Sequence, residues 1–322
     1  MANDSLNSDR DLAVRAAWLS YVGGHTQAEI AQMLGLSRMK VHRLIATAID
    51  EGVVKVFIEG EPAELIRLEN FLSERFGLQT CTVVPSVPAG VENPFVNLGT
   101  AAARFLKTRL DSGDVKVLGL GWGRTLGEMV RRLPQTARPD LEAVAVLGSV
   151  TEEMALSPYD VVHRLVDATD ARGYLLPLPL FADSAEDRET LLAQRRVRKV
   201  YDLACRADLV MVGIAALPPL GYSLLQELNQ VSRGEYRTLH DSGAVAEVVA
   251  QFIDRRGEVI DCELNRRSLG VSLDVLRELP LVAVAGGEEK VPAILAALKS
   301  GMLNGLITDE TVAWRLYEII DN

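Results

Sequence analysis

Two stretches of this 322-residue chain place glycines and a cation directly after a run of apolar, strand-like residues. In the first, the run Leu118–Leu120 leads into a glycine-rich turn and a helix-like segment. Glycines allow a ligand to approach the backbone, and the N–H groups that open a helix favour an anion. The turn lacks the lysine of a nucleoside-triphosphate loop and the spacing of a dinucleotide fingerprint. A phosphate is the simplest ligand for its four polar or conformationally free residues, Gly121, Gly123, Arg124 and Thr125.

A packing role for the same glycines stays open, because a tight turn also lets a helix lie close to a sheet. In the second stretch, two glycines precede Lys290, which from this segment alone is better interpreted as a surface lysine. A third candidate is the loop 148–160, where Tyr159 and Asp160 could bind a polyhydroxylated ligand. The first segment alone does not decide between its two interpretations, and the third is weak evidence by itself.

A different chemistry is indicated by residues 26–50, which read as two short helices joined by a turn. Apolar residues recur at helical spacing in both halves, Gly35 can take a left-handed turn, and Ser37 is a suitable N-cap. No acid occurs between Arg38 and Ile49, so the outward face of the second helix is basic or neutral. This pattern predicts a helix-turn-helix that enters a DNA major groove. We expect seven residues to contact DNA: Gln27, Ser37, Arg38, Met39, Lys40, His42 and Arg43.

The alternative for this segment is a three-helix packing unit whose basic face is simply solvated. A helix over Asp11–Val22 would complete its core around Trp18, and the β-branched run Val53–Ile58 predicts a wing strand. The winged helix-turn-helix head would then occupy residues 1–59. Residues 60–76 read as a linker helix that either packs on the next domain or dimerises.

From residue 77 to 322, apolar runs alternate with helical patterns, which predicts an α/β domain with a mostly parallel sheet. We expect effector binding and oligomerisation to lie in this domain. Ligands of such folds bind at the carboxyl ends of the strands. The expected strands are Thr80–Val84, Val115–Leu120, Ala143–Leu147, Tyr174–Leu178, Leu209–Ile214 and Leu281–Ala285. The expected helices are Ala101–Leu110, Leu126–Leu133, Asp160–Asp170, Glu186–Cys205, Ala244–Phe252 and Pro292–Lys299.

The composition and charge of the chain argue against a membrane protein, a disulfide-rich protein and a metal-binding protein. The absence of an apolar run of membrane-spanning length and the polar first twelve residues favour a cytoplasmic protein without a membrane partner. Three scattered cysteines suggest buried thiols and neither a disulfide framework nor a metal site. A net charge of -10 argues against nucleic acid coating the whole surface. Residues 1–60 hold six Lys or Arg against seven acids, so we expect a multimer to present several heads.

Several motifs together resemble the SorC family of bacterial sugar-responsive transcriptional regulators, and within it regulators of polyol catabolism such as that of erythritol. The resemblance covers nearly the whole chain. Besides the helix-turn-helix, its motifs are Gly121–Thr125, Ser157–Asp160, Leu176–Pro179, Gly243–Glu247, Ala285–Lys290 and Thr308–Glu310.

The resemblance implies a Rossmann-like effector domain of the sugar-phosphate isomerase/deaminase type, a tetramer, and a sugar, polyol or sugar-phosphate effector that controls operator binding. Arg124 and Thr125 would hold a phosphate or terminal hydroxyls, Glu247 would accept from sugar hydroxyls, and Lys290 would complete the site. Ala246-Glu247 stands where the family usually has Gly-Asp, and Arg124 where some members have threonine. Unphosphorylated polyols therefore stay open as effectors.

The competing prediction is an isomerase- or deaminase-like enzyme, in which Lys290 would form a Schiff base or Glu247 would act as a base. The four histidines are scattered, and no paired carboxylates with a nearby histidine occur at motif spacing. We therefore expect a regulator with no catalytic residues, no metal and no cofactor.

Overall fold

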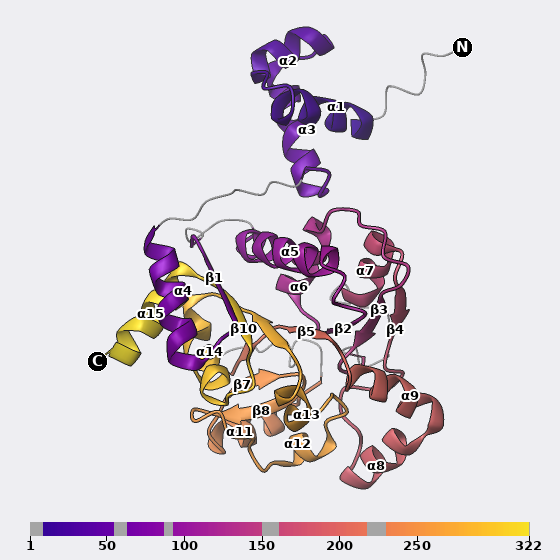
Figure 1. The fold of residues 1–322 in the computed structure, drawn as a ribbon, viewed down its shortest axis with the longest axis vertical. Coiled ribbons are helices and arrows are strands. Elements are labelled where there is room, and N and C mark those ends of the chain that lie inside the picture. Colours follow the sequence, from indigo (N-terminus) through magenta and orange to yellow (C-terminus); the bar gives the residue numbers. More distant parts are fainter. Residues whose placement is uncertain (1–8, 55–62, 87–92, 150–160, 218–229, 322) are drawn as a thin grey trace. The chain divides into compact units, whose positions relative to one another are not determined.

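The computed structural model describes residues 9–54, 63–86, 93–149, 161–217 and 230–321 (Figure 1). The chain divides into two compact units, Met1–Ile58 and Glu59–Asn322. We call them the head and the body and describe each by itself. Among the described residues, no helix is long and apolar enough to cross a membrane, and no cluster of His, Cys, Asp or Glu could hold a metal ion.

The head contains the predicted helix-turn-helix. Its helices are α1 (Asp9–Tyr21), α2 (Gln27–Leu34) and α3 (Arg38–Asp50). Thr26 and Glu29 form a reciprocal capping box at the start of α2, and Gly35 ends that helix with a φ of 65°. Ser37 then caps α3, its hydroxyl accepting a hydrogen bond from the Lys40 N–H at 3.2 Å. Local capping thus fixes both sides of the turn.

The described residues of the head show neither a core around Trp18 nor a wing strand. Trp18 was expected in the core and is 59% exposed, so that prediction is wrong. Small residues of α1 fill the position instead, since Ala13, Ala16 and Ala17 pack against α2 and α3. The predicted wing lies largely on residues 55–62, outside the described residues, and Val53 and Val54 are not in a strand.

The body is built on a seven-stranded parallel sheet, which confirms the predicted α/β fold. Its strands are β1 (Thr80–Val84), β2 (Val117–Leu120), β3 (Glu142–Ala145), β4 (Arg172–Tyr174), β5 (Leu209–Val212), β9 (Leu281–Val284) and β10 (Gly305–Asp309). They lie in the order β1-β10-β9-β5-β2-β3-β4. From β2 the chain proceeds outward through β3 and β4, then returns to place β5 on the other side of β2. The topological switch point therefore lies between β2 and β5, where doubly wound folds bind ligands.

Strand residues alternate between two apolar layers. Leu118 and Met211 contact the cluster formed with α5 (Val96–Asp111), α6 (Arg124–Arg132) and α7 (Val161–Thr169). Val117 and Val210 contact the larger cluster on the opposite face. That face is covered chiefly by α4 (Ala63–Phe76), α9 (Arg195–Ala204), α14 (Val291–Lys299) and α15 (Glu310–Asp321) (Figure 1). The predicted linker helix, α4, buries Leu65, Leu68 and Leu72 in this cluster, and so packs on the body.

Smaller elements complete the body. The strands β6 (Ala215–Ala216), β7 (Ala244–Val248) and β8 (Gln251–Asp254) form an antiparallel sheet. Within the described parts of the body, the remaining helices are α8 (Ala185–Ala193), α11 (Arg233–Asp241), α12 (Glu263–Arg267), α13 (Leu273–Arg277) and the 3-10 turn η1 (Glu288–Lys290).

Three predicted elements differ from the structure. The helix expected over Ala244–Phe252 is the β7–β8 hairpin. The helix expected over Glu186–Cys205 is divided into α8 and α9, because Gln194 is extended, with a ψ of 129°. The strand expected over Tyr174–Leu178 overlaps β4 only at Tyr174. Two strands, β6 and β10, were not predicted.

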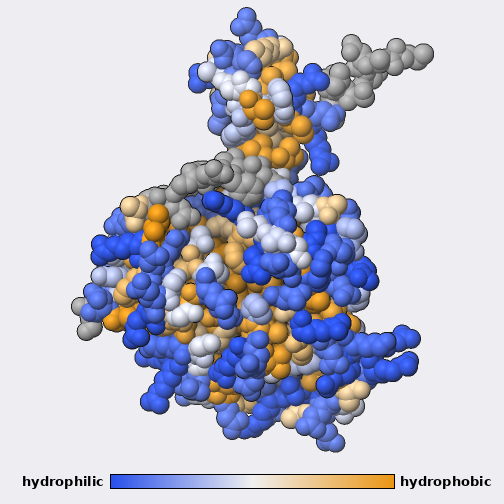
Figure 2. Space-filling view, in the orientation of Figure 1, coloured by the Kyte–Doolittle hydropathy of each residue, from blue (hydrophilic) through white to orange (hydrophobic). Residues whose placement is uncertain are grey.

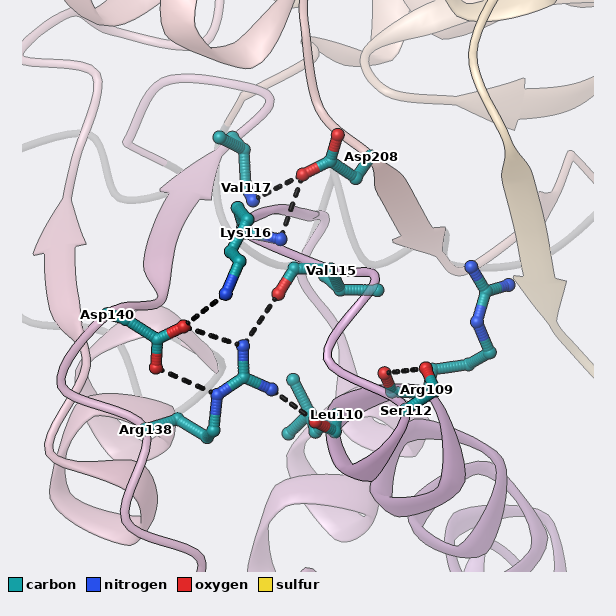
Figure 3. A network of polar contacts seen from close by, with 9 residues as sticks. All are labelled: Arg109, Leu110, Ser112, Val115, Lys116, Val117, Arg138, Asp140 and Asp208. Carbon is teal, nitrogen blue, oxygen red and sulfur yellow. Dashed lines mark hydrogen bonds and ion pairs between the residues drawn. The ribbon is translucent and has the colours of Figure 1, made fainter.

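A polar network lies at the amino-terminal ends of the neighbouring strands β2, β3 and β5 (Figure 3). One carboxylate oxygen of Asp208 accepts hydrogen bonds from the N–H groups of Lys116 and Val117, both at 2.8 Å. Asp140 pairs with Lys116 and Arg138, and its pKa is lowered, chiefly by the hydrogen bond from Arg138. These contacts hold β2 between β3 and β5, with the carboxyl ends of the same strands at the opposite edge.

Candidate functional site

A cavity of about 230 Å³ lies at the carboxyl ends of β2, β5 and β9, at the topological switch point. All six predicted effector residues that the structure describes line it: four follow β2, Glu247 lies on β7 and Lys290 follows β9. Its lining includes Phe95, Gly121, Trp122, Gly123, Arg124, Thr125, Val212, Gly213, Glu247, Val249, Glu289 and Lys290. The other two, Tyr159 and Asp160, lie outside the described residues.

The turn between β2 and α6 supplies backbone donors to this cavity. Gly123 has a φ of 127°, a conformation that side-chain-bearing residues rarely adopt, and no side chain caps α6. The first N–H groups of a helix have no partner within the helix and carry partial positive charge. Gly121 lies close to β5, since a Cβ there would be 3.3 Å from the Cα of Val212. The glycines thus serve both roles considered from the sequence: close packing and an open helix start.

Arg124 begins α6 and is exposed, with its guanidinium carbon 4.8 Å from the centre of the Phe95 ring. A cation over an aromatic face is stabilised by the ring quadrupole, so Phe95 positions the guanidinium at the cavity wall. Thr125, by contrast, is only 8% exposed and presents a hydroxyl. Sequence reasoning missed Phe95, because an aromatic residue before a helix carries no signal that it will meet a glycine-rich turn after a later strand.

Glu247 and Lys290 bring opposite charges to the same cavity. Glu247, on β7, is 4% exposed, and burial raises its pKa to about 7 despite a hydrogen bond from Ala250 and the nearby Lys290. The pKa of Lys290 is lowered, first by burial, while Glu289 and Glu247 oppose that effect. A partly desolvated ammonium and a buried carboxyl are strong partners for a polar ligand, because little water competes with them.

Glu247 also supports an unusual turn. Val249 and Ala250, the two residues between β7 and β8, have φ values of 52° and 58°. This left-handed conformation is uncommon for alanine and an outlier for a β-branched residue. The Ala250 N–H donates to Glu247 Oε1 at 2.5 Å, and Val249 lines the cavity. The strained turn places this carboxylate at the cavity wall.

The cavity can therefore bind a small ligand with a negative and a hydroxylated part. The start of α6, Arg124 and Lys290 suit an anion, and Glu247 can accept from hydroxyl groups. Aromatic and aliphatic residues, among them Trp122 and Val212, line the remaining wall. A cavity with cationic donors at one end, a carboxyl acceptor and an apolar wall is suited to carbohydrates and polyol phosphates.

The outward face of α3 in the head is the second candidate site. Arg38, Met39, His42 and Arg43 are exposed, Met39 to 76%. Figure 2 shows hydrophobic residues at the surface of the head. Besides Met39 on α3, the exposed large hydrophobic residues include Trp18 and Tyr21 on α1.

The other predicted DNA contacts have partners within the head. Ser37 is used as a helix cap, and Gln27 Nε2 lies 3.4 Å from His42 Nδ1. Lys40 is half-buried and pairs with Asp9 at 2.7 Å, which lowers the pKa of that carboxyl. This pair was not predicted, and it reduces the positive charge of the α3 face.

Comparisons with known proteins agree with this two-part organisation. Residues 61–318 match the Sugar-bind family model, which describes a sugar-binding domain, and residues 6–51 match sigma-70 region 4. The chain is 42% identical to the erythritol catabolism regulatory protein EryD of Brucella abortus, over 95% of this chain and 96% of the relative. It is 35% identical to the transcriptional regulator LsrR of Enterobacter sp., over 95% and 92% of the two chains.

Solved structures show the same architecture. The full-length sorbitol operon regulator SorC of Klebsiella pneumoniae aligns with a TM-score of 0.73 and 25% identity, covering 96% of this chain and 99% of that one. The fold is also shared by a DeoR family transcriptional regulator of Listeria monocytogenes, with a TM-score of 0.70 and 23% identity over 78% of this chain and 98% of that one. With a helix-turn-helix head, a sugar-binding body and regulators as full-length relatives, the chain belongs to the SorC-like family of sugar-binding transcriptional regulators.

Proposed function

We propose that this protein controls a carbohydrate or polyol catabolic operon, and that a polyol, a sugar or its phosphate ester bound in the body cavity sets its affinity for operator DNA. The observation that carries the proposal is the cavity itself. It combines the open start of α6, two cationic side chains and a buried carboxyl at one topological switch point. The effector residues are Gly121, Gly123, Arg124, Thr125, Glu247 and Lys290.

A phosphate ester is the effector that this charge distribution favours. Arg124 and Lys290 would face its phosphate, with the α6 N–H groups as further donors. Glu247 would accept from the hydroxyls of the carbon chain. The names of two relatives, an erythritol catabolism regulator and a sorbitol operon regulator, support a polyol chain.

DNA reading is assigned to the exposed side of α3. Arg38 and Arg43 are the cations for phosphates or guanine edges, with Met39 and His42 beside them. We further propose that the protein acts in the cytoplasm as a homo-tetramer. Effector binding would then change the spacing of the heads relative to operator half-sites.

A binding screen tests the proposal directly. Erythritol, sorbitol, their phosphate monoesters and inorganic phosphate are each added to the full-length protein, and its melting temperature is recorded. A ligand at one hundred times its dissociation constant stabilises by about 2.7 kcal/mol. Lys290→Met should abolish the shift, whereas Lys299→Met, at the other end of α14, should not. No shift with any member of the panel would refute the effector assignment.

The enzyme alternative is favoured by one observation, the raised pKa of Glu247 beside the lowered pKa of Lys290. Groups with such shifts are common in active sites. The same panel is therefore incubated with the protein, and the compounds are quantified over hours by mass spectrometry. Consumption that Lys290→Met abolishes would establish catalysis, and unchanged compounds beside a clear melting shift would support the regulator.

A further inference from the structure

The cavity loop that carries Lys290 is attached to the carboxyl-terminal helix by the side chain of Asp309. One carboxylate oxygen of Asp309 accepts from the Gly287 N–H at 2.6 Å, and the other accepts from the Val312 N–H at 2.9 Å. A Cβ on Gly286 would lie 2.2 Å from this carboxylate, so the approach requires glycine. The carboxylate thus joins the loop after β9 to the first turn of α15.

A second attachment lies one turn further along α15. Arg315 donates through Nε and Nη2 to a single oxygen of Glu288, at 3.0 and 2.7 Å, and through Nη1 to Glu318 at 3.1 Å. Glu288 is in η1, directly before Glu289 and Lys290, which line the cavity. Two neighbouring residues of the loop are therefore tied to α15 on separate turns of that helix.

The same helix packs on α4 through aromatic side chains. The centre of the Tyr317 ring lies 4.6 Å from that of Phe71 and 5.7 Å from that of Trp314. The guanidinium carbon of Arg67 lies 5.9 Å from the centre of the Tyr317 ring. Phe71 and Arg67 belong to α4, the first helix of the body after the head in chain order. A continuous set of contacts thus runs from the cavity loop through α15 to α4.

We propose that Asp309 and Arg315 are positioning residues that hold the Gly286–Lys290 loop and transmit its position through α15 to α4. This inference rests on the proposed function, because it gives effector binding a route toward the head. A ligand shifts an equilibrium only by its different affinity for the two states. The position of the Lys290 ammonium supplies that difference, because a movement of the loop would shift or break its contacts with Asp309 and Arg315.

The first test needs no small molecule. Amide hydrogen exchange is measured by mass spectrometry on full-length wild type, Asp309→Asn and Arg315→Ala. Asp309→Asn turns one acceptor oxygen into an amide donor facing Gly287. Arg315→Ala removes an exposed ion pair, so it should fold normally. The matched control is Arg266→Ala, whose side chain is also 52% exposed and pairs with Asp261 at 2.8 Å, in a different part of the body.

Exchange should accelerate severalfold both in residues 286–291 and in residues 63–76 of α4 for the two test variants, and in neither region for the control. Faster exchange in residues 286–291 alone would show a merely local structural role and overturn the relay. As a reciprocal check, Tyr317→Leu removes the ring contacts with α4 and should accelerate exchange in residues 286–291. No change there would also contradict the proposal.

A second test measures coupling with erythritol 4-phosphate as the probe and a duplex selected by the wild-type protein from random DNA. Arg315→Ala should bind the probe and the duplex each within about threefold of wild type. The effect of the probe on duplex affinity should fall to less than a third of the wild-type factor. Undiminished coupling would overturn the relay. A wild-type protein that ignores the probe would count against the proposed effector, while the exchange test still decides the relay.

Discussion

The burial of Glu247 leads to a prediction with a definite sign and size. Folding raises its pKa from 4.5 to about 7. Between these values the folded state holds a proton that the unfolded state has lost, so stability falls as the pH rises through this window. A shift of this size corresponds to about 3 kcal/mol, since each pKa unit is worth about 1.4 kcal/mol. Glutamine has nearly the same shape and does not titrate.

We therefore expect Glu247→Gln to match wild type near pH 4 and to be more stable by about 3 kcal/mol at pH 8. For a domain of this size, 1 kcal/mol moves the melting temperature by roughly 2–4 °C, so calorimetry should show a difference of about 6–12 °C at pH 8. Melting temperatures that stay parallel from pH 4 to pH 8 would refute the argument that burial raises the pKa of the Glu247 carboxyl.

A carboxylate with the opposite shift is the control. The pKa of Glu235 is lowered, because hydrogen bonds from Ser232 and Arg267 outweigh its burial. Its contribution to stability is present above the unfolded pKa and is lost as the pH falls. Glu235→Gln should therefore be less stable than wild type at pH 8 and equal to it in acid, the reverse of Glu247→Gln.

Three further predictions address the two sites. Arg43→Ala should weaken binding to the selected duplex roughly tenfold in a gel-shift titration and leave the effector-induced melting shift intact. Asp9→Asn, which frees Lys40, should instead tighten binding to the duplex. Loss of the melting shift in Arg43→Ala would contradict the assignment of DNA binding to the head and effector binding to the body. Lys290→Met should abolish the effector response of operator binding while the free protein binds the duplex normally. Gly123→Ala forces a side chain into a φ of 127° and should weaken effector binding in calorimetry, whereas Gly113→Ala, at a remote turn, should cost stability alone.

The elements predicted correctly are those for which the local residue pattern and the burial of the apolar residues favour the same structure. The helix-turn-helix follows from apolar spacing, Gly35 and Ser37, each of which acts locally. The central strands were predicted because a parallel sheet covered on both faces needs continuous apolar runs, as in Leu209–Val212. The strand ends alone did not bring Arg124 and Lys290 together, and only the resemblance to the SorC family implied that they share one site. The structure places both at one cavity.

The errors arose where tertiary contacts override local signals. Residues 244–252 hold alanines and apolar residues without a turn residue, so they read as a helix. In the structure Val249 and Ala250 make the turn in a left-handed conformation, and the Glu247 side chain bonds the turn backbone. Likewise, neither glycine nor proline marks Gln194, where the chain becomes extended between α8 and α9. The role of Asp309 was not predicted. Of its two backbone partners, Gly287 is distant in sequence, and Val312 is close but carries no sequence signal for the contact.

The charge of the head leads to the last prediction. Residues 1–58 hold six Lys or Arg and six acids, and Lys40 is already paired with Asp9. On α3 this leaves Arg38 and Arg43 as exposed cations, so one head should neutralise only about two or three phosphates. Linked heads would add their contacts. The logarithm of affinity should therefore fall with the logarithm of salt about twice as steeply on a duplex with two half-sites as on one with a single half-site. Equal slopes for the full-length protein on the two duplexes would mean that a single head supplies all the DNA contacts, and that the body does not need to gather several heads for binding.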